Sequence, residues 1–146
     1  MDTKFGAAIE TGQAEEFVKT ALGLKEIPGY KSYISVDGGM TDNPRYALYK
    51  ARYTAYLASD MGREYDGTYT LAGRCCESGD IIIEKMRFPR CRRGDIIAVA
   101  ATGAYNYSMA SNYNRFPRPP IVMIKDGRAS IAVRRESIDD MLACDL

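Results

Sequence analysis

The stretch GRCCESGD, residues 73–80, places two adjacent cysteines and a glutamate in front of a run of turn-forming residues. A thiol can act as a nucleophile or a proton donor and a carboxylate can bind an amine, so Cys76 and Glu77 are the first candidates for chemistry. Adjacent cysteines are poorly placed to bridge to each other, while Ser, Gly and Asp favour a turn. We expect a strand that ends here and offers both groups at its edge, with plain packing as the competing interpretation.

A second candidate is the polar loop DGGMTDNPR, residues 37–45, which follows the strand-like run SYISV. Paired glycines allow the backbone to approach a ligand closely. Arg45 lies at a predicted helix start and can hold a carboxylate by a two-point contact, and Tyr49, four residues on, falls on the same helix face. A surface loop with a solvated arginine is the alternative.

A third candidate is GAYNYSMASNYN, residues 103–114, which follows the apolar run IIAVAAT. Its hydroxyls and amides can meet phosphate or carboxylate oxygens. The chain has eleven tyrosines and no tryptophan, and tyrosine joins an apolar ring to a hydroxyl that can reach a ligand or a partner. A wide turn without a ligand is the competing interpretation.

The composition argues against several other kinds of site. Histidine is absent, so no serine or cysteine can be paired with a histidine base, and the four cysteines form no CxxC pair, so we expect no metal site. Lys+Arg and Asp+Glu number 20 and 19, and this balance argues against nucleic-acid and membrane-surface binding. No apolar run reaches membrane-spanning length and the N-terminus lacks the order of a signal peptide, so we expect a cytoplasmic protein.

The elements that must position these candidates are mostly strands. Residues 11–23 have the apolar spacing of a short amphipathic helix, NPRYALYKA begins with a proline at a helix-start position, and Ser137 is a candidate N-cap for a terminal helix. The runs bounded by Gly, Pro or Asp that we predict as strands are RYTAYLAS, GTYTLAG, IIIEKM, DIIAVAA, PIVMIKD and ASIAVRR, in addition to SYISV. The fold class is therefore mainly β, a barrel or a sandwich.

Three segments together resemble one family. VDGGMTDNPRYALY (36–49), CESGD (76–80) and TGAYNYSMASNYNRFPRP (102–119) resemble, in their order and approximate spacing, the C-terminal part of the diaminopimelate decarboxylases. That family belongs to the pyridoxal-phosphate-dependent decarboxylases with an alanine-racemase-like fold. The resemblance covers about residues 25–146, and it implies a C-terminal β domain that follows a cofactor-binding (β/α)8 barrel.

The resemblance also implies roles for individual residues. Arg45 and Tyr49 resemble the residues that bind the substrate's distal carboxylate. Glu77 resembles the group that meets the distal amine, and Cys76 resembles a proton donor near the reacting carbon; one subunit inserts this pair into its neighbour's site. Tyr105 resembles the tyrosine that contacts the phosphate of pyridoxal 5'-phosphate.

The implied reaction is the decarboxylation of meso-2,6-diaminopimelate to L-lysine and CO2 in lysine biosynthesis, carried out by a homodimer. One departure is Tyr46, where the family more usually has proline. This difference bears on the local turn and leaves Arg45 and Tyr49 in place.

Residues 1–30 resemble a remnant of the barrel, a helix with a connector, and residues 31–146 resemble the β domain with its active-site loops. The family's cofactor lysine, its ring-stacking histidine and its phosphate loop have no counterpart in the sequence. We therefore expect the isolated chain to be inactive, and we do not expect it to bind pyridoxal 5'-phosphate stably. Three interpretations stay open: a truncated portion of the enzyme, the β-domain half of a split enzyme completed by a barrel-bearing chain, and a non-catalytic interaction module.

Overall fold

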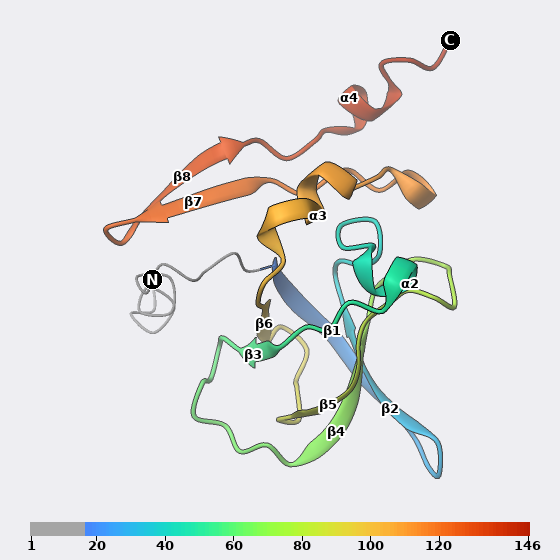
Figure 1. Ribbon diagram of the computed structural model, residues 1–146, viewed down its shortest axis with the longest axis vertical. Helices are drawn as coiled ribbons and strands as arrows, with labels where there is room; N and C mark the ends of the chain where they lie inside the picture. Colours follow the sequence, from blue (N-terminus) through green and yellow to red (C-terminus); the bar gives the residue numbers. More distant parts are fainter. Residues whose placement is uncertain (1–16) are drawn as a thin grey trace.

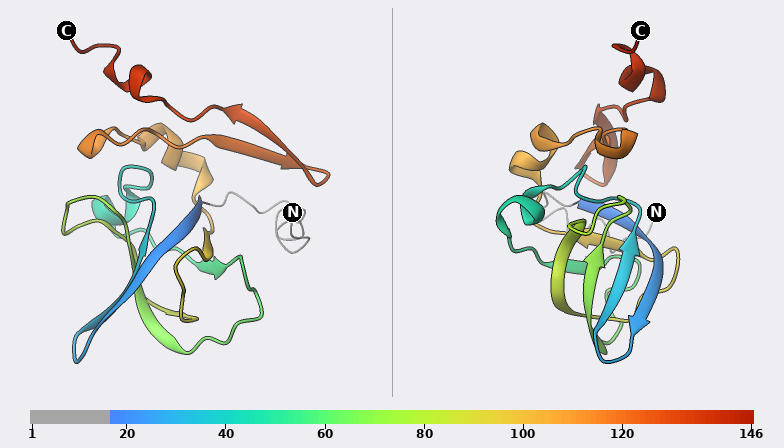
Figure 2. Two further views of the ribbon diagram at one scale, coloured as in Figure 1. Left: turned by 180° about the vertical axis from the view of Figure 1, so that it is seen from behind. Right: turned by 90° about the vertical axis from the view of Figure 1, so that its right-hand side faces the viewer.

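The computed structural model describes residues 17–146, and strands dominate them. A six-stranded sheet with the order β3-β6-β1-β2-β4-β5 curves around a common core, and a separate two-stranded ribbon of β7 and β8 lies beside it (Figures 1 and 2). The strands are β1 Phe17–Ile27, β2 Lys31–Val36, β3 Ala55–Leu57, β4 Gly67–Ala72, β5 Ile81–Phe88, β6 Ile96–Val99, β7 Ile121–Lys125 and β8 Arg128–Val133. The helices are α2 Arg45–Tyr49, α3 Gly103–Met109, the 3-10 turn η1 Tyr113–Arg115 and α4 Ile138–Leu142. The expected mainly β fold is confirmed.

The helix expected over residues 11–23 is wrong in its described part, because residues from Phe17 onward form β1. This strand lies inside the sheet: residues 17–20 pair with β6, and residues 21–27 pair with β2. Backbone groups that are paired with neighbouring strands outweigh the helical spacing of the apolar residues. Residues 11–16 lie outside the described part. The sheet thus begins upstream of residue 31, while the barrel-derived origin of residues 1–30 stays a prediction.

The core is built from buried apolar side chains of all the strands of the six-stranded sheet. Ile34 and Val36 of β2 are fully buried, and Leu71 of β4 and Ile82 of β5 meet them from the neighbouring strands. Burying one aliphatic side chain of this size contributes about 1.5–3 kcal/mol. The core therefore fixes the registers of the strands that carry the candidate loops.

Two short helices agree with the sequence-based expectation, and a third was not expected. α2 begins directly after Pro44. α4 begins after Ser137, whose hydroxyl accepts a hydrogen bond from the Asp140 N–H while the Asp140 carboxylate accepts one from the Ser137 N–H. Residues 103–109 form α3 instead of the wide turn that was weighed for this segment. Among the helices of the described residues, none is long and apolar enough to cross a membrane.

Strand direction explains why the candidate segments can meet. β2 and β4 are parallel neighbours, with Ser35 opposite Ala72. β6 is antiparallel to β1, which is antiparallel to β2, so β6 runs in the same direction as β2 and β4. The segments that follow β2, β4 and β6 therefore leave the sheet at the same end, where Figure 1 shows α2 and α3.

Candidate functional site

Arg45 lies at the start of α2 in a cluster of tyrosines. Its Nε donates a hydrogen bond of 2.6 Å to the hydroxyl of Tyr49, as the four-residue spacing predicts. The guanidinium carbon lies 5.6, 5.8 and 5.9 Å from the ring centres of Tyr49, Tyr53 and Tyr105. We call these four residues the arginine–tyrosine cluster. α2 and α3 thus bring together three of the five predicted site residues.

The arginine–tyrosine cluster holds the Arg45 guanidinium in place and leaves it accessible to solvent. Arg45 is half-buried, whereas the side chains of Tyr49 and Tyr105 are 55% and 62% exposed. Tyr53 is held in place because its hydroxyl donates a 3.0 Å hydrogen bond to the fully buried Asn43. A guanidinium that is flanked by aromatic faces and still reaches solvent can bind a carboxylate with its remaining N–H groups.

Cys76 and Glu77 lie in the loop between β4 and β5, just past the end of a strand as predicted, and both are exposed. The Glu77 carboxylate accepts hydrogen bonds from the Gly79 N–H at 3.2 Å, the Ser78 hydroxyl at 3.2 Å and the Tyr113 hydroxyl at 3.3 Å. These donors, the Gly79 N–H first, lower the pKa of Glu77 below its ordinary value. Glu77 is therefore a fixed anion at neutral pH and suits an ammonium group.

The cysteines differ in what their surroundings allow. Burial raises the pKa of the Cys91 thiol to about 12, and burial also raises the pKa of Cys75. A thiol that stays protonated in an apolar setting is unreactive. Cys76 is the exposed neighbour of the anionic Glu77, so within this loop it is the cysteine that a ligand can reach.

Asp80 joins two of the candidate loops, and sequence reasoning missed it. This carboxylate is 3% exposed and accepts hydrogen bonds of 2.6 Å from both the Met40 N–H and the Cys75 N–H. Gly39 and Gly73 lie against it so closely that a Cβ atom at either position would overlap the carboxylate. Asp80 thus ties the loop after β2 to the loop after β4. Its place after Ser-Gly indicated only a turn.

A buried ion pair stabilises the loop that follows β2. The Lys19 ammonium donates a 3.0 Å hydrogen bond to the Asp42 carboxylate, and the two side chains are 8% and 4% exposed. Burial lowers the pKa of Lys19, although Asp42 opposes this shift. A Cβ atom at Gly38 would overlap the Lys19 side chain. The glycine pair at 38–39, expected to admit a ligand, is buried and makes room for Lys19 and Asp80.

The third predicted segment, residues 102–119, contacts both of the other two. The Ser111 N–H donates a 2.9 Å hydrogen bond to the Thr41 carbonyl, and the Arg74 guanidinium carbon lies 4.1 Å from the ring centre of Phe116. With the bond from Tyr113 to Glu77, these contacts link all three predicted segments at one end of the sheet. The structure brings Cys76 and Glu77 together in one loop and Arg45, Tyr49 and Tyr105 together in the arginine–tyrosine cluster.

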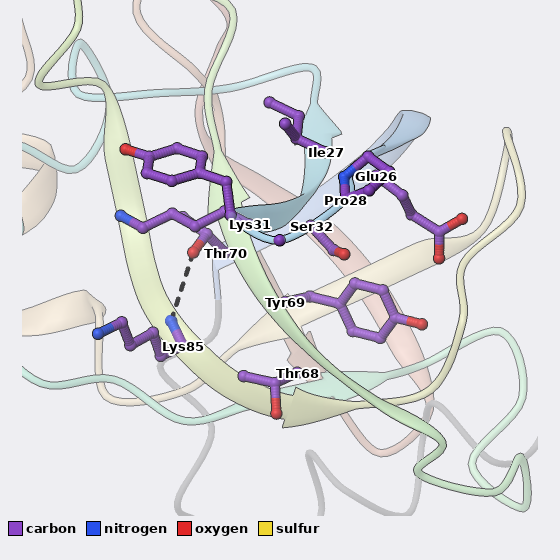
Figure 3. A pocket seen from close by; sticks show the side chains of 11 residues that line it. Glu26, Ile27, Pro28, Lys31, Ser32, Thr68, Tyr69, Thr70 and Lys85 are labelled. Atoms are coloured by element: carbon purple, nitrogen blue, oxygen red, sulfur yellow. Dashed lines mark hydrogen bonds between the residues drawn. The ribbon is translucent and has the colours of Figure 1, made fainter.

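Two large grooves lie on the described part of the chain, and of the arginine–tyrosine cluster only Tyr53 borders one of them. One, of about 610 Å³, is bordered by the β1–β2 turn, by β4 and by Lys85, whose N–H donates to the Thr70 hydroxyl at 3.4 Å (Figure 3). The other, of about 550 Å³, runs between α2 and β5. None of the five predicted site residues lines either groove. Cys76, Glu77, Tyr49 and Tyr105 are themselves exposed, so this surface can face a second body.

Comparisons with known proteins find relatives in one family. Residues 13–103 match the family described as pyridoxal-dependent decarboxylase, C-terminal sheet domain. The chain is 47% identical over 135 residues to the diaminopimelate decarboxylase of Bacillus subtilis, which covers 92% of the chain and 31% of that relative. It is 50% identical over 123 residues to the diaminopimelate decarboxylase of Synechocystis, covering 84% of the chain and 26% of the relative.

Solved structures give the same result for the fold. The crystal structure of diaminopimelate decarboxylase from M. jannaschii in complex with L-lysine superimposes with a TM-score of 0.83 at 28% identity, over 90% of this chain and 30% of that one. The Helicobacter pylori diaminopimelate decarboxylase complexed with L-lysine superimposes with a TM-score of 0.78 at 29% identity, over 88% of this chain and 31% of that one. The chain spans about a third of the length of these relatives.

Proposed function

The chain belongs to the pyridoxal-dependent decarboxylases, whose C-terminal sheet domain it carries, and we propose that it supplies the residues for the substrate's distal end in a diaminopimelate decarboxylase. The reaction would convert meso-2,6-diaminopimelate to L-lysine and CO2 in lysine biosynthesis. The observation that carries the proposal is that the arginine–tyrosine cluster and the Cys76–Glu77 loop lie at the same end of one sheet. The names of the relatives support the choice of substrate.

The two charged groups match the substrate's distal carbon, which carries one ammonium and one carboxylate. Arg45 supplies N–H donors for the carboxylate, and its orientation is held by the Tyr49 hydroxyl. Glu77 supplies an anion for the ammonium and is held by Gly79, Ser78 and Tyr113. An amine without the distal carboxylate would leave Arg45 without its partner, so the pair selects a diamino dicarboxylate over a simple diamine.

The described residues do not complete a site for pyridoxal 5'-phosphate, which supplies the electron sink for amino-acid decarboxylation when bound. The cofactor requires a lysine that can form an imine. None of the five predicted site residues is a lysine, and Lys19 and Lys31 donate to Asp42 and Glu84. In this proposal the imine lysine comes from outside the 146 residues. Tyr105 contributes a phosphate contact from the edge, and Cys76 holds a proton near the reacting carbon.

The proposed subunit arrangement follows from the same geometry. Cys76 and Glu77 lie in an exposed loop, so they can enter a site formed by another subunit of a homodimer or by a barrel-bearing chain. In a homodimer each chain would then give Arg45 to one site and its Cys76–Glu77 loop to the other. The exposed rings of Tyr49 and Tyr105 would be covered in that assembly. This role favours a working part of an enzyme over a self-sufficient binding module.

Nuclear magnetic resonance titration of the chain tests the proposed specificity. Adding meso-diaminopimelate should shift the Arg45 Nε–H and Glu77 carboxyl signals, while the diamine 1,5-diaminopentane, which lacks the distal carboxylate, should bind at least about tenfold more weakly and leave Arg45 unshifted. Arg45→Gln should abolish this discrimination. Equal responses to the two ligands, or shifts confined to residues outside the arginine–tyrosine cluster and the 73–80 loop, would rule out this function.

A further inference from the structure

The direction of Arg45 depends on a helix that cannot stabilise itself. α2 has five residues, none of them buried, and its N-cap Pro44 makes no side-chain hydrogen bond to the helix. Helices of this length do not persist alone in water, so their orientation comes from tertiary contacts. α2 packs against β5, and the question is which side chain fixes it there.

Tyr46 makes that contact. Its hydroxyl donates a 2.7 Å hydrogen bond to Oε2 of Glu84 on β5, and Oε1 of the same carboxylate accepts a 2.5 Å hydrogen bond from Lys31 on β2. The Lys50 ammonium lies 4.7 Å from the centre of the Tyr46 ring. Glu84 of β5, which Lys31 links to β2, and Lys50 directly after α2 therefore hold the phenol group of Tyr46.

The acceptor in this contact stays charged. Hydrogen bonds from Lys31 and Tyr46 lower the pKa of Glu84 to about 2, so the carboxylate is ionised at every pH at which the enzyme would work. A charged acceptor makes a stronger hydrogen bond than a neutral one. The contact between Tyr46 and Glu84 is thus constant in the neutral pH range.

Arg45 and Tyr46 are consecutive residues on a helix, so their side chains leave it about 100° apart. Tyr46 reaches the sheet, and Arg45 reaches Tyr53 and Tyr105. Rotation of α2 about its axis would break the bond to Glu84 and carry the guanidinium away from the tyrosine rings. The two contacts therefore define the same rotation.

We propose that Tyr46 is a positioning residue: by binding Glu84 it fixes the rotation of α2 and so aims Arg45 at the distal carboxylate of the substrate. The inference rests on the proposed function for the role of Arg45, but the coupling of Tyr46 to Arg45 is a property of this chain that can be measured without substrate. Glu84 acts one step further from Arg45 than Tyr46, and Lys31, which holds Glu84, acts two steps further.

The test compares Tyr46→Phe and Glu84→Gln with Tyr56→Phe, a control tyrosine on β3. Without ligand, Tyr46→Phe should shift the Arg45 Nε–H signal and speed amide exchange at Leu48 and Lys50 about fivefold, the effect of losing one hydrogen bond. Glu84→Gln keeps an acceptor for the phenol and should have a smaller effect. Tyr56→Phe should change neither the signal nor the exchange.

The affinity for meso-diaminopimelate separates positioning from a loss of folding. Tyr46→Phe should weaken binding about fivefold, and it should have no further effect on binding in an Arg45→Gln background, although the faster exchange at Leu48 remains. Unchanged Arg45 signals and exchange rates in Tyr46→Phe would overturn the inference. If the wild-type chain fails to bind meso-diaminopimelate, the proposed function fails, while the Arg45 signal still decides whether Tyr46 positions it.

Discussion

The carboxylate of Asp80 accepts a 2.6 Å hydrogen bond from the backbone N–H of Cys75, the residue directly before the candidate thiol. The other carboxylate oxygen accepts an equally short bond from Met40, in the loop that leads to α2. One buried side chain thus sets the position of the Cys76–Glu77 loop relative to the segment that carries Arg45.

Replacing Asp80 should therefore loosen both halves of the site. Asp80→Asn keeps one acceptor oxygen but turns an amide NH2 toward a backbone N–H, and we expect a loss of about 1–3 kcal/mol in the free energy of unfolding. Urea unfolding measures this loss, with the exposed Glu64→Gln as the control. A loss no larger than that of the control would show that Asp80 does not join the loops.

The Lys19–Asp42 pair should respond asymmetrically to substitution. Asp42→Ala leaves the buried Lys19 ammonium without this carboxylate and should cost about 3–5 kcal/mol of stability, whereas the paired change Lys19→Met with Asp42→Leu should recover part of it. Both variants can be followed by urea unfolding. If the double variant is as unstable as Asp42→Ala, an uncompensated charge is not the cause of the loss.

The carboxyl group of Glu84 should titrate at a pH far below that of an ordinary glutamate. Its folded pKa is about 2 instead of 4.5, so the stability it contributes is fully present above the ordinary value and is lost as the pH falls toward 2. Carboxyl resonances followed by NMR between neutral and acidic pH measure this directly. Lys31→Met removes the largest cause and should move the Glu84 midpoint upward; a midpoint unaffected by that change would contradict the geometry.

Tyr113 should tune the charge of Glu77. The Tyr113 hydroxyl is one of several donors that lower the pKa of Glu77, and the Gly79 N–H has the largest effect. Tyr113→Phe should therefore raise the Glu77 pKa but leave it below its ordinary value. The same NMR titration reads this shift, and a Glu77 midpoint equal to that of the wild type would exclude the hydrogen bond from Tyr113.

Local patterns in the sequence predicted the local parts of the structure. The four-residue spacing of Arg45 and Tyr49 placed them on one helix face, and Ser137 was identified as an N-cap. The turn-forming residues after Glu77 predicted the bend between β4 and β5. Each of these features depends on residues at most eight positions apart, so composition and spacing carry the signal.

The features that sequence reasoning missed depend on distant partners. The apolar residues of β1 fit helical spacing as well as a strand, and the pairing of Phe17 with Val99 decides the outcome. Asp80 draws its role from Met40, forty residues away. The shared direction of β2, β4 and β6, which gathers the candidate loops at one end, follows from strand pairings that no local pattern encodes.

Lysine formation from meso-diaminopimelate tests whether this chain supplies the missing part of a diaminopimelate decarboxylase. The chain is assayed with pyridoxal 5'-phosphate alone, and then mixed with the part of the Bacillus subtilis relative that lies outside its match to this chain. That relative's own C-terminal portion serves as the positive control for the mixture. We predict no lysine from the chain alone. We predict lysine from the mixture, and we predict that Arg45→Gln or Glu77→Gln abolishes it. Lysine production by the chain alone would contradict this prediction. So would a mixture that produces no lysine while the positive control does.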